Sequence, residues 1–233
     1  MFIAENLAHI LENINIAANK ANNIGRNITD RVKLVAVTKN QSVSAIREAI
    51  AAGVMAIGEN RIQEAVDKAQ SLDIPVEWQL IGHLQTNKVR HAVSLFDMIQ
   101  SVDSERLAVE IDRAAGKIGK RQDILLQVNA ANEDTKFGIS AREVMSLGRI
   151  INNLENVRLC GLMTVAPFYE NTELARPIFR EMFKLFVELR DANLVNTKIE
   201  WLSMGMTNDY MVAVEEGSNL VRIGTGIFGQ RQY

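Results

Sequence analysis

The sequence predicts an α/β protein that folds as a single (β/α)8 TIM barrel, and three observations lead to this class. Eight short apolar or β-branched runs alternate with longer amphipathic runs along the 233 residues. Such alternation is typical of parallel strands joined by crossover helices. Eight strands favour a closed barrel, because an open doubly wound sheet commonly uses about five or six. An extra amphipathic run precedes the first strand.

That extra run predicts a helix at the start of the chain. Apolar side chains recur at helical spacing at Ile3, Leu7, Ile10, Leu11 and Ile14, and the pattern ends near Gly25. Only residues 224–233 follow the eighth strand, which is too short a segment for a full outer helix. We therefore expect the opening helix to cover that part of the barrel.

The other elements are expected in strict alternation. We expect strands at 33–38, 55–57, 77–81, 97–100, 124–129, 157–163, 199–202 and 220–223. We expect the helices between them at 43–52, 62–70, 105–118, 141–150, 172–190 and 209–216. Because the chain has three prolines and no Gly/Ser-rich or single-charge tract, residues 1–233 are expected to form one domain.

The composition argues against several classes of function. Apolar residues make up 47% and charged residues 23%, and the net charge of -2 gives no indication of a nucleic-acid partner. No apolar run approaches about 18 residues and no secretory signal pattern opens the chain, so we expect a cytoplasmic protein without a membrane partner. Cys160 lies in an apolar run and is expected to be a buried filler. No Cys, His or Asp grouping has the spacing of a metal site.

Lys39 is the first candidate for chemistry. It follows the apolar strand expected at 33–38, at the point where that strand meets a loop. In a barrel, the residues at the carboxyl ends of the strands form the site. Apolar neighbours disfavour the ammonium form, so a nucleophilic amine becomes accessible and can form a Schiff base with an aldehyde. The alternative is a charged lysine that caps the strand.

Two glycine-containing segments follow the seventh and eighth strands. They are LSMGMT at 202–207 and GTG at 224–226. Barrels often bind phosphate at this place, where hydroxyl groups and unobstructed backbone amides hold the oxygens. The alternative is that the glycines only relieve strain in tight turns.

Arg222 lies within the apolar eighth strand, so its permanent charge needs a partner. A ligand atom is one candidate, and an internal ion pair with Glu59 or Asp209 is the other. A lysine that forms imines, together with a phosphate cup opposite it, indicates a phosphorylated aldehyde. Pyridoxal 5'-phosphate (PLP), a form of vitamin B6, fits this description.

Seven motifs resemble those of the YggS/PROSC family of PLP homeostasis proteins, relatives of the barrel domain of alanine racemase. They are AVTK at 36–39, GENRIQE at 58–64, IGHLQTNK at 81–88, TKFG at 135–138, GLMT at 161–164, LSMGMTND at 202–209 and VRIGTGIFG at 221–229. They span nearly the whole chain in order. The resemblance implies the fold type III barrel of PLP proteins without the C-terminal β domain of the racemases.

The resemblance also implies the roles of individual residues. Lys39 is expected to carry PLP as a covalent internal aldimine, and Arg222 is expected to face the pyridine nitrogen. The remaining cofactor-binding residues fall into two groups. The phosphate is expected at Ser203, Gly205, Gly224 and Thr225, and the ring is expected to be lined by Asn60 and Met204.

Two positions depart from the common pattern of the family, and a third matches it. Arg61 stands where the family commonly has an aromatic residue, and Gln79 stands near a common histidine. Both are expected at the rim of the barrel, where they would affect ligand access. Lys136 resembles a family lysine near the barrel mouth, and a solvated loop lysine accounts for it equally well.

The expected function is a PLP-binding protein without catalytic residues. Arg222 can only donate to the pyridine nitrogen, which stays neutral, so that PLP becomes a poorer electron sink. The racemases that the chain resembles add a tyrosine base from another domain, and none of the three tyrosines here lies in a matching motif.

The expected role is to hold PLP as a reversible Schiff base, for PLP homeostasis or delivery to apo-enzymes, as a monomer. One alternative is a slow PLP-dependent racemase or decarboxylase. The others are an aldolase that forms a Schiff base without a cofactor and an interaction module without any ligand.

Overall fold

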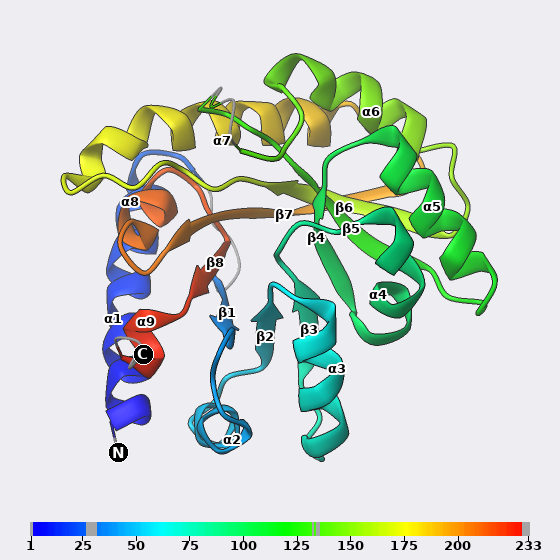
Figure 1. Ribbon diagram of the computed structural model, residues 1–233. Helices are drawn as coiled ribbons and strands as arrows, with labels where there is room; N and C mark the ends of the chain where they lie inside the picture. The colour runs from blue at the N-terminus through cyan, green and yellow to red at the C-terminus, as the bar shows by residue number, and fades with distance from the viewer. Residues whose placement is uncertain (1, 27–31, 132, 134–135, 230–233) are drawn as a thin grey trace.

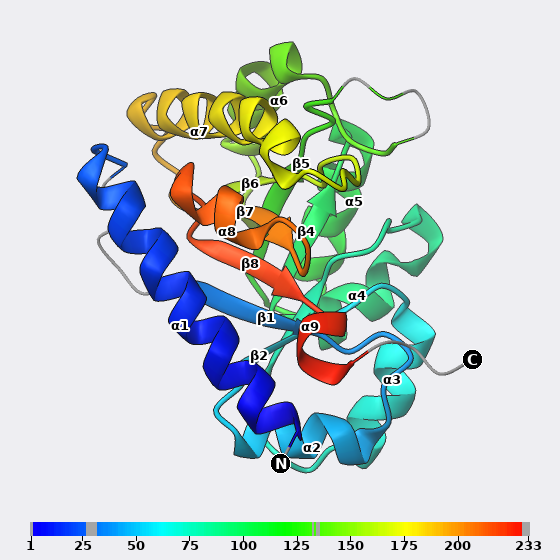
Figure 2. The ribbon, with the colours of Figure 1, turned by 90° about the vertical axis from the view of Figure 1, so that its left-hand side faces the viewer.

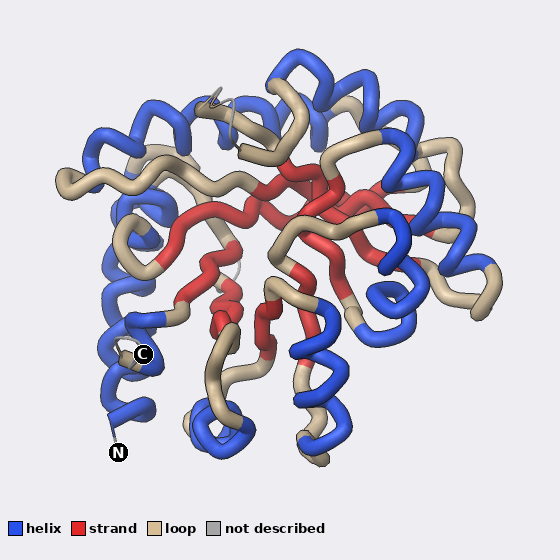
Figure 3. The backbone as a smooth tube through the Cα atoms, viewed as in Figure 1, coloured by secondary structure: helices blue, strands red, loops and turns tan. Residues whose placement is uncertain are grey.

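The structure is a computed structural model that describes residues 2–26, 32–131, 133 and 136–229. Its eight strands are all parallel and close into a barrel in the order β1 to β8. The register of the closing pair aligns Val35 of β1 with Arg222 of β8. Figure 3 shows the strands in the interior and the helices around them. The predicted TIM barrel is confirmed.

The strands largely follow the predicted pattern. They are β1 (Lys33–Val37), β2 (Ala56–Glu59), β3 (Glu77–Leu80), β4 (Met98–Val102), β5 (Gln122–Gln127), β6 (Val157–Met163), β7 (Thr197–Met206) and β8 (Leu220–Ile223). The main difference is in β7, which continues beyond the predicted end at Leu202. Ser203, Met204 and Gly205 therefore lie in a strand, where successive side chains point to opposite faces.

The helices lie outside the barrel. They are α1 (Phe2–Asn23), α2 (Val43–Ala51), α3 (Ile62–Ser71), α4 (Val89–Leu95), α5 (Glu105–Gly116), α6 (Val144–Ile151), α7 (Arg176–Asp191), α8 (Tyr210–Glu215) and α9 (Thr225–Phe228). Single 3-10 turns precede three of them, η1 (Thr86–Lys88), η2 (Ala141–Glu143) and η3 (Thr172–Ala175). None of the helices described here combines the length and apolar character that crossing a membrane requires.

Two apolar layers follow from the alternation of side chains along the strands. Ala36 and Ile57 belong to the main core between strands and helices, whereas the adjacent Val35 and Ala56 pack with Trp201 inside the barrel. A second interior cluster contains Cys160, whose burial raises the pKa of its thiol to about 12. The prediction that Cys160 is a buried filler is confirmed.

Helix α1 covers the side of the barrel where β8 and β1 meet. Figures 1 and 2 show it beside α8 and α9, with its long axis crossing β1 and β8. Its buried face carries four of the five predicted apolar residues, Ile3, Leu7, Ile10 and Ile14, whereas the fifth, Leu11, is exposed. Since α9 is only four residues long, α1 takes the place of a full outer helix after β8, as the sequence predicts.

A buried carboxylate, that of Glu216 after α8, joins the end of α1 to α7 through three arginines. The fully buried side chain of Glu216 accepts hydrogen bonds from Arg26 Nη2 at 2.7 Å, Arg176 Nη1 at 2.8 Å and Arg180 Nε at 3.1 Å. Burial opposes the charge of Glu216, but the three arginines outweigh it, and the pKa of this carboxyl group lies below its ordinary value of 4.5.

We expect Glu216→Gln to lower the free energy of unfolding by about 2 kcal/mol at neutral pH, because it removes a buried negative charge that three arginines contact. A depressed pKa stabilises the fold above the unfolded-state pKa, and this contribution is lost as the pH falls through the folded-state pKa. The difference from the wild type should therefore begin to shrink as the pH falls below about 4. Urea unfolding between pH 7 and pH 3 measures it, with Glu12→Gln on the exposed face of α1 as the control. A difference that grows on acidification would contradict the assignment.

Candidate functional site

The carboxyl ends of four neighbouring strands bring together most of the residues predicted to bind a cofactor. Lys39 follows β1 and Asn60 follows β2, while Gly205 lies near the end of β7 and Gly224 follows β8. The strands pair in the order β7, β8, β1 and β2, so these residues share one sector of the barrel mouth. This is the end of a TIM barrel at which sites form.

Lys39 has a half-buried side chain at this mouth. Within the described part of the chain its amine makes no hydrogen bond and no ion pair. Two other lysines near β1 differ, since Lys33 pairs with Glu77 and Lys68 pairs with Glu59. An amine without a carboxylate partner is available to a ligand, as the sequence analysis expects for Lys39.

Backbone amides converge on the mouth after β8. The amides of Gly224 and Gly226 both donate to Thr207 Oγ1, at 3.3 Å and 3.2 Å. Thr207 lies in the segment predicted to form the cup, but the sequence analysis assigned it no role. The exposed Thr225 lies between the two glycines at the start of α9. These donors form a small cradle of the kind that holds phosphate oxygens.

Gly205 is required by the local geometry of β7. Its φ is 94°, in the region that side chains disfavour. A Cβ atom at this position would also lie 2.7 Å from Ala213 Cβ and 2.9 Å from Tyr210 Cα. The absence of a side chain therefore lets α8 approach the strand, next to the cradle.

Arg222 is buried below the cradle and has no countercharge in contact. Its guanidinium group donates to Ser203 Oγ and, at 2.7 Å, to the carbonyl oxygen of Thr164. Among the described residues it makes no ion pair, and Glu59 is occupied by Lys68 instead. Burial lowers the pKa of Arg222 to about 10, while the charge of Asp209 opposes this shift. The predicted internal ion pair with Glu59 or Asp209 is therefore not formed, and the cation can accept a ligand partner.

A chain of polar side chains runs from Arg222 down the inside of the barrel. Ser203 Oγ donates to Gln100 Oε1 at 2.6 Å, and Gln100 in turn donates to Gln79. Gln79 Nε2 donates to Glu77 Oε1 at 2.7 Å, and Glu77 pairs with Lys33. Ser203, Gln100 and Gln79 are fully buried. This chain connects the mouth with the opposite end of the barrel.

This row of hydrogen-bonded side chains corrects the expected position of Gln79 and includes Gln100, to which the sequence pattern gave no role. Gln79 lies inside the barrel rather than at its rim, because its position in β3 directs the side chain inward. Arg61 is exposed at the start of α3, as expected for the rim. The sequence analysis missed Gln100, although an amide in an apolar strand is a signal of an internal hydrogen bond.

Two residues predicted to touch the cofactor lie elsewhere than expected. The hydroxyl of Ser203 is held between Arg222 and Gln100 below the mouth. The side chain of Met204 packs in the main core, on the side of β7 that faces the helices. Both placements follow from the extension of β7, which turns a predicted loop into alternating strand positions.

The opposite side of the mouth is formed by loops after β3, β4 and β5. The ring of His83 stacks on Phe137 with 3.8 Å between ring centroids, and its Nδ1 lies 3.3 Å from Asp103 Oδ2. Lys136 pairs with Glu133 at 3.1 Å. Thr135 of the same motif lies outside the described residues. The contacts of His83 join these three loops.

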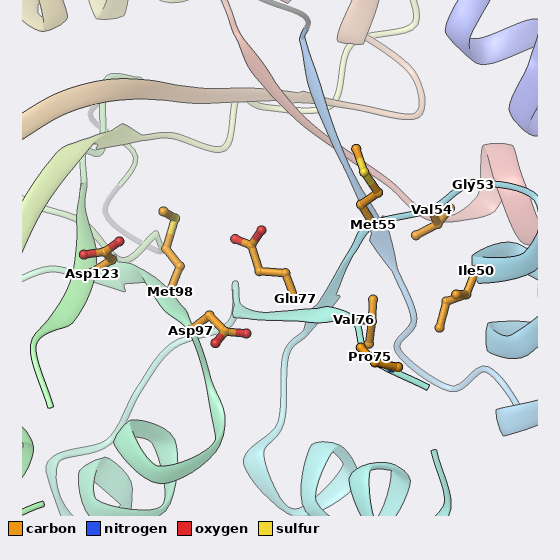
Figure 4. Close-up of a pocket in the computed structure, with 10 residues that line it drawn as sticks. All are labelled: Ile50, Gly53, Val54, Met55, Pro75, Val76, Glu77, Asp97, Met98 and Asp123. Carbon is orange, nitrogen blue, oxygen red and sulfur yellow. The ribbon is translucent and has the colours of Figure 1, made fainter. Parts of the chain in front are cut away.

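A concavity of about 790 Å³ lies away from the mouth, at the amino ends of β2 to β5 (Figure 4). Its three carboxylates have internal partners. Glu77 pairs with Lys33, Asp97 accepts from the Trp78 amide, and Asp123 pairs with Arg158. No group of three His, Cys, Asp or Glu residues in the described ranges has the geometry of a metal site. The candidate site is therefore the mouth.

The fold and the residues of the mouth define the class of this protein. The family "Alanine racemase, N-terminal domain" matches residues 6–232. A solved alanine racemase of Clostridium difficile 630 superposes with a TM-score of 0.73 at 17% identity, covering 96% of this chain and 61% of that chain. At this identity the likeness concerns the fold alone. The chain is a barrel of the alanine racemase N-terminal domain class.

Closer relatives narrow the class. The "Pyridoxal phosphate homeostasis protein" of Aquifex aeolicus (strain VF5) is 40% identical over 234 residues, which cover 100% of each chain. PipY of Synechococcus elongatus PCC7942, solved without PLP, has a TM-score of 0.86 at 37% identity and covers 97% of this chain and 100% of its own. Its structure with PLP bound has a TM-score of 0.79 at 36% identity, covering 91% and 100%. The chain belongs to the family of pyridoxal phosphate homeostasis proteins.

Proposed function

We propose that this protein binds PLP at the barrel mouth and holds it through a covalent, reversible bond between the amine of Lys39 and the aldehyde carbon. The observation that carries the proposal is the combination of an amine and a buried cation, both without a carboxylate in contact among the described residues, on the paired strands β1 and β8. The relationship to PipY, which has been solved with PLP bound, supports it.

The residues of the mouth fit the chemical groups of PLP. The amides of Gly224 and Thr225, with Gly205 opposite them on β7, receive the phosphate. Thr207 Oγ1, which now accepts from two glycine amides, lies at the same cradle. Asn60 lines the ring from the end of β2. Ser203 contributes indirectly, because its hydroxyl orients Arg222 from below.

Arg222 decides which chemistry the site favours. PLP supplies an electrophilic aldehyde and a ring that accepts electrons best when its nitrogen is protonated. A guanidinium group has N–H donors and no acceptor, so it donates to a neutral pyridine nitrogen and does not protonate it. Even with its pKa lowered to about 10, Arg222 remains charged at neutral pH. The site therefore favours holding the aldehyde over stabilising a carbanion.

The function that follows is a carrier or buffer of PLP in vitamin B6 homeostasis rather than an enzyme. A half-buried Lys39 at an open strand end allows amines or apo-enzymes to approach the bound aldehyde and take it over. The cytoplasmic location, the monomeric state and the single domain stay predictions from the sequence. A slow racemase is the alternative, which the shared fold of alanine racemase favours.

Two measurements on the purified wild-type protein test the proposal. Equilibrium dialysis should show that PLP binds at one site per chain and that pyridoxal, which lacks the phosphate, binds far more weakly. With PLP and alanine in deuterated water, the α-proton should exchange no faster than with the same amount of free PLP.

Each measurement has an outcome that contradicts the proposal. Equal affinity for pyridoxal and PLP would exclude a phosphate cradle at Gly224 and Thr225. Exchange well above that of free PLP would establish the racemase alternative. A colourless protein trapped by borohydride only with a sugar phosphate would identify an aldolase instead.

A further inference from the structure

A buried ion-pair network lies directly behind Lys39, between the barrel wall and α3. It consists of Glu59 at the end of β2, with Glu64 and Lys68 on α3. Glu59 is fully buried and the residue Lys68 is 7% exposed. The network faces the helix layer, on the other side of the wall from the mouth, so it does not belong to the cofactor site described above.

Lys68 uses all three of its N–H donors within this network. Its Nζ donates to Glu59 Oε1 at 2.6 Å, to Glu64 Oε1 at 2.7 Å and to the carbonyl oxygen of Thr38 at 2.6 Å. An ammonium group with three acceptors in place has no lone pair to offer a carbonyl compound. Lys68 is therefore not a second amine for the aldehyde.

The acceptors of the network hold the backbone on both sides of Lys39. On one side, Thr38 contacts the network twice: its carbonyl accepts from Lys68, and its hydroxyl donates to Glu59 Oε1 at 2.6 Å. On the other side, the Asn40 amide donates to Glu64 Oε1 at 2.6 Å. Asn40 has a φ of 62°, in the left-handed region that L-residues rarely adopt. The peptide units before and after Lys39 are thus fixed by one lysine and two glutamates.

Stability alone is a poor account of this arrangement. Taking a lysine and a glutamate out of water is costly, and buried ion pairs are commonly no more stabilising than apolar residues of similar size. Glu59 Oε2 has no hydrogen-bond partner among the residues that the structure describes, and burial raises the pKa of Glu59 despite its bonds to Lys68 and Thr38. The network includes this unpaired buried oxygen and lies beside the turn at Asn40. The geometry that it imposes on this turn explains the network better than stability does.

We infer that Lys68 is a positioning residue for Lys39: it fixes the strand end at Thr38 and, through Glu64, the turn at Asn40, so that the Lys39 amine projects into the mouth. This inference rests on the proposed function, because it takes Lys39 as the residue that bonds the aldehyde. The amine and aldehyde must approach within bonding distance and release water as the C=N bond forms. A displaced strand end lowers the rate of that step even when PLP occupies its cradle.

The test uses Lys68→Met, which keeps most of the length of the side chain and removes its donors. Covalent attachment is followed by borohydride quenching at successive times and mass spectrometry of the peptide that contains Lys39. We expect attachment to slow by about tenfold to a hundredfold, the cost of a small misplacement of a reacting group. Pyridoxamine 5'-phosphate carries an amine in place of the aldehyde, so it reports on the pocket alone, and its affinity should be unchanged.

The matched control is Lys120→Met at the other end of the barrel. Lys120 is half-buried and holds two backbone carbonyls, those of Val93 and Phe96, at 2.8 Å and 2.7 Å. Lys120→Met should lower the stability in urea unfolding without any change in attachment to Lys39. If Lys68→Met does not fold, two variants of Glu64 test the positioning role instead. Glu64→Ala removes the acceptor for the Asn40 amide and should slow attachment to Lys39. Glu64→Gln keeps an acceptor and should restore most of the rate.

The outcomes separate this inference from the proposed function. A wild-type protein that gains no adduct on Lys39 overturns both. The positioning role alone is overturned if the wild type gains its normal adduct and Lys68→Met gains it at the same rate. If Lys68→Met does not fold, equal rates in the wild type and in both Glu64 variants overturn it. Equal losses of attachment and of pyridoxamine 5'-phosphate affinity would show that Lys68 supports the whole pocket, which also overturns it.

Discussion

Lys39→Ala should abolish covalent attachment of PLP and leave the barrel folded. Lys39 follows β1 and has no partner among the described residues, so its removal breaks no hydrogen bond that the structure describes there. Without the amine, PLP is retained only through its phosphate and ring contacts. The absorbance band of the aldimine that the wild type forms with PLP should be lost, and borohydride reduction should leave the mass of the variant unchanged.

The control for this experiment is Lys88→Ala, an exposed lysine just before α4. It should keep the colour and the pyridoxyl adduct of the wild type. Circular dichroism should show the same helix content in all three proteins. A stoichiometric adduct on another lysine in Lys39→Ala would show that a different lysine is the reactive amine and would contradict the proposed site.

Ser203→Ala should have the largest effect on folding among substitutions of a single small side chain at this site. The change leaves the buried Arg222 guanidinium and Gln100 Oε1 without their shared partner inside the barrel. A buried group that loses its hydrogen bond carries its full desolvation cost, and the cost is greater when the group is charged. We expect the free energy of unfolding to fall by about 3 kcal/mol, measured by urea denaturation at neutral pH.

Ser101→Ala is the matched comparison for Ser203→Ala. Ser101 is also fully buried, and its hydroxyl donates to the Gly82 carbonyl at 2.7 Å, so its removal affects one neutral acceptor. Its cost should be about 1 kcal/mol. Equal costs for the two serines would show that Arg222 finds another partner and that the polar chain is not cooperative.

Much of the architecture could be predicted from local sequence patterns. The strands at 157–163 and 220–223 have the predicted bounds, and the apolar spacing of Ile3, Leu7, Ile10 and Ile14 identified the helix that replaces an outer helix. Periodicity in a strand or a helix depends on neighbours along the chain, which a sequence displays directly. The position of Lys39 at a strand end depends on the same local signals.

The interior partners depended on the tertiary structure. Ser203 and Met204 lie on opposite faces of β7 because the strand runs on to Met206, which the sequence pattern did not predict. Gln79 meets Gln100 only because β3 and β4 pair side by side in the closed barrel.

The buried ion-pair network behind Lys39 shows the same difference between what local sequence predicts and what the tertiary structure adds. The sequence by itself determined that a lysine follows an apolar strand in a barrel with glycine-rich turns after its last strands. Only the tertiary structure decided that Lys68, on α3, holds the peptide units on both sides of that lysine. The physical reason is that burial and hydrogen bonding are properties of groups brought together by the closure of the barrel, and residues far apart in the chain give no local sign of their contact.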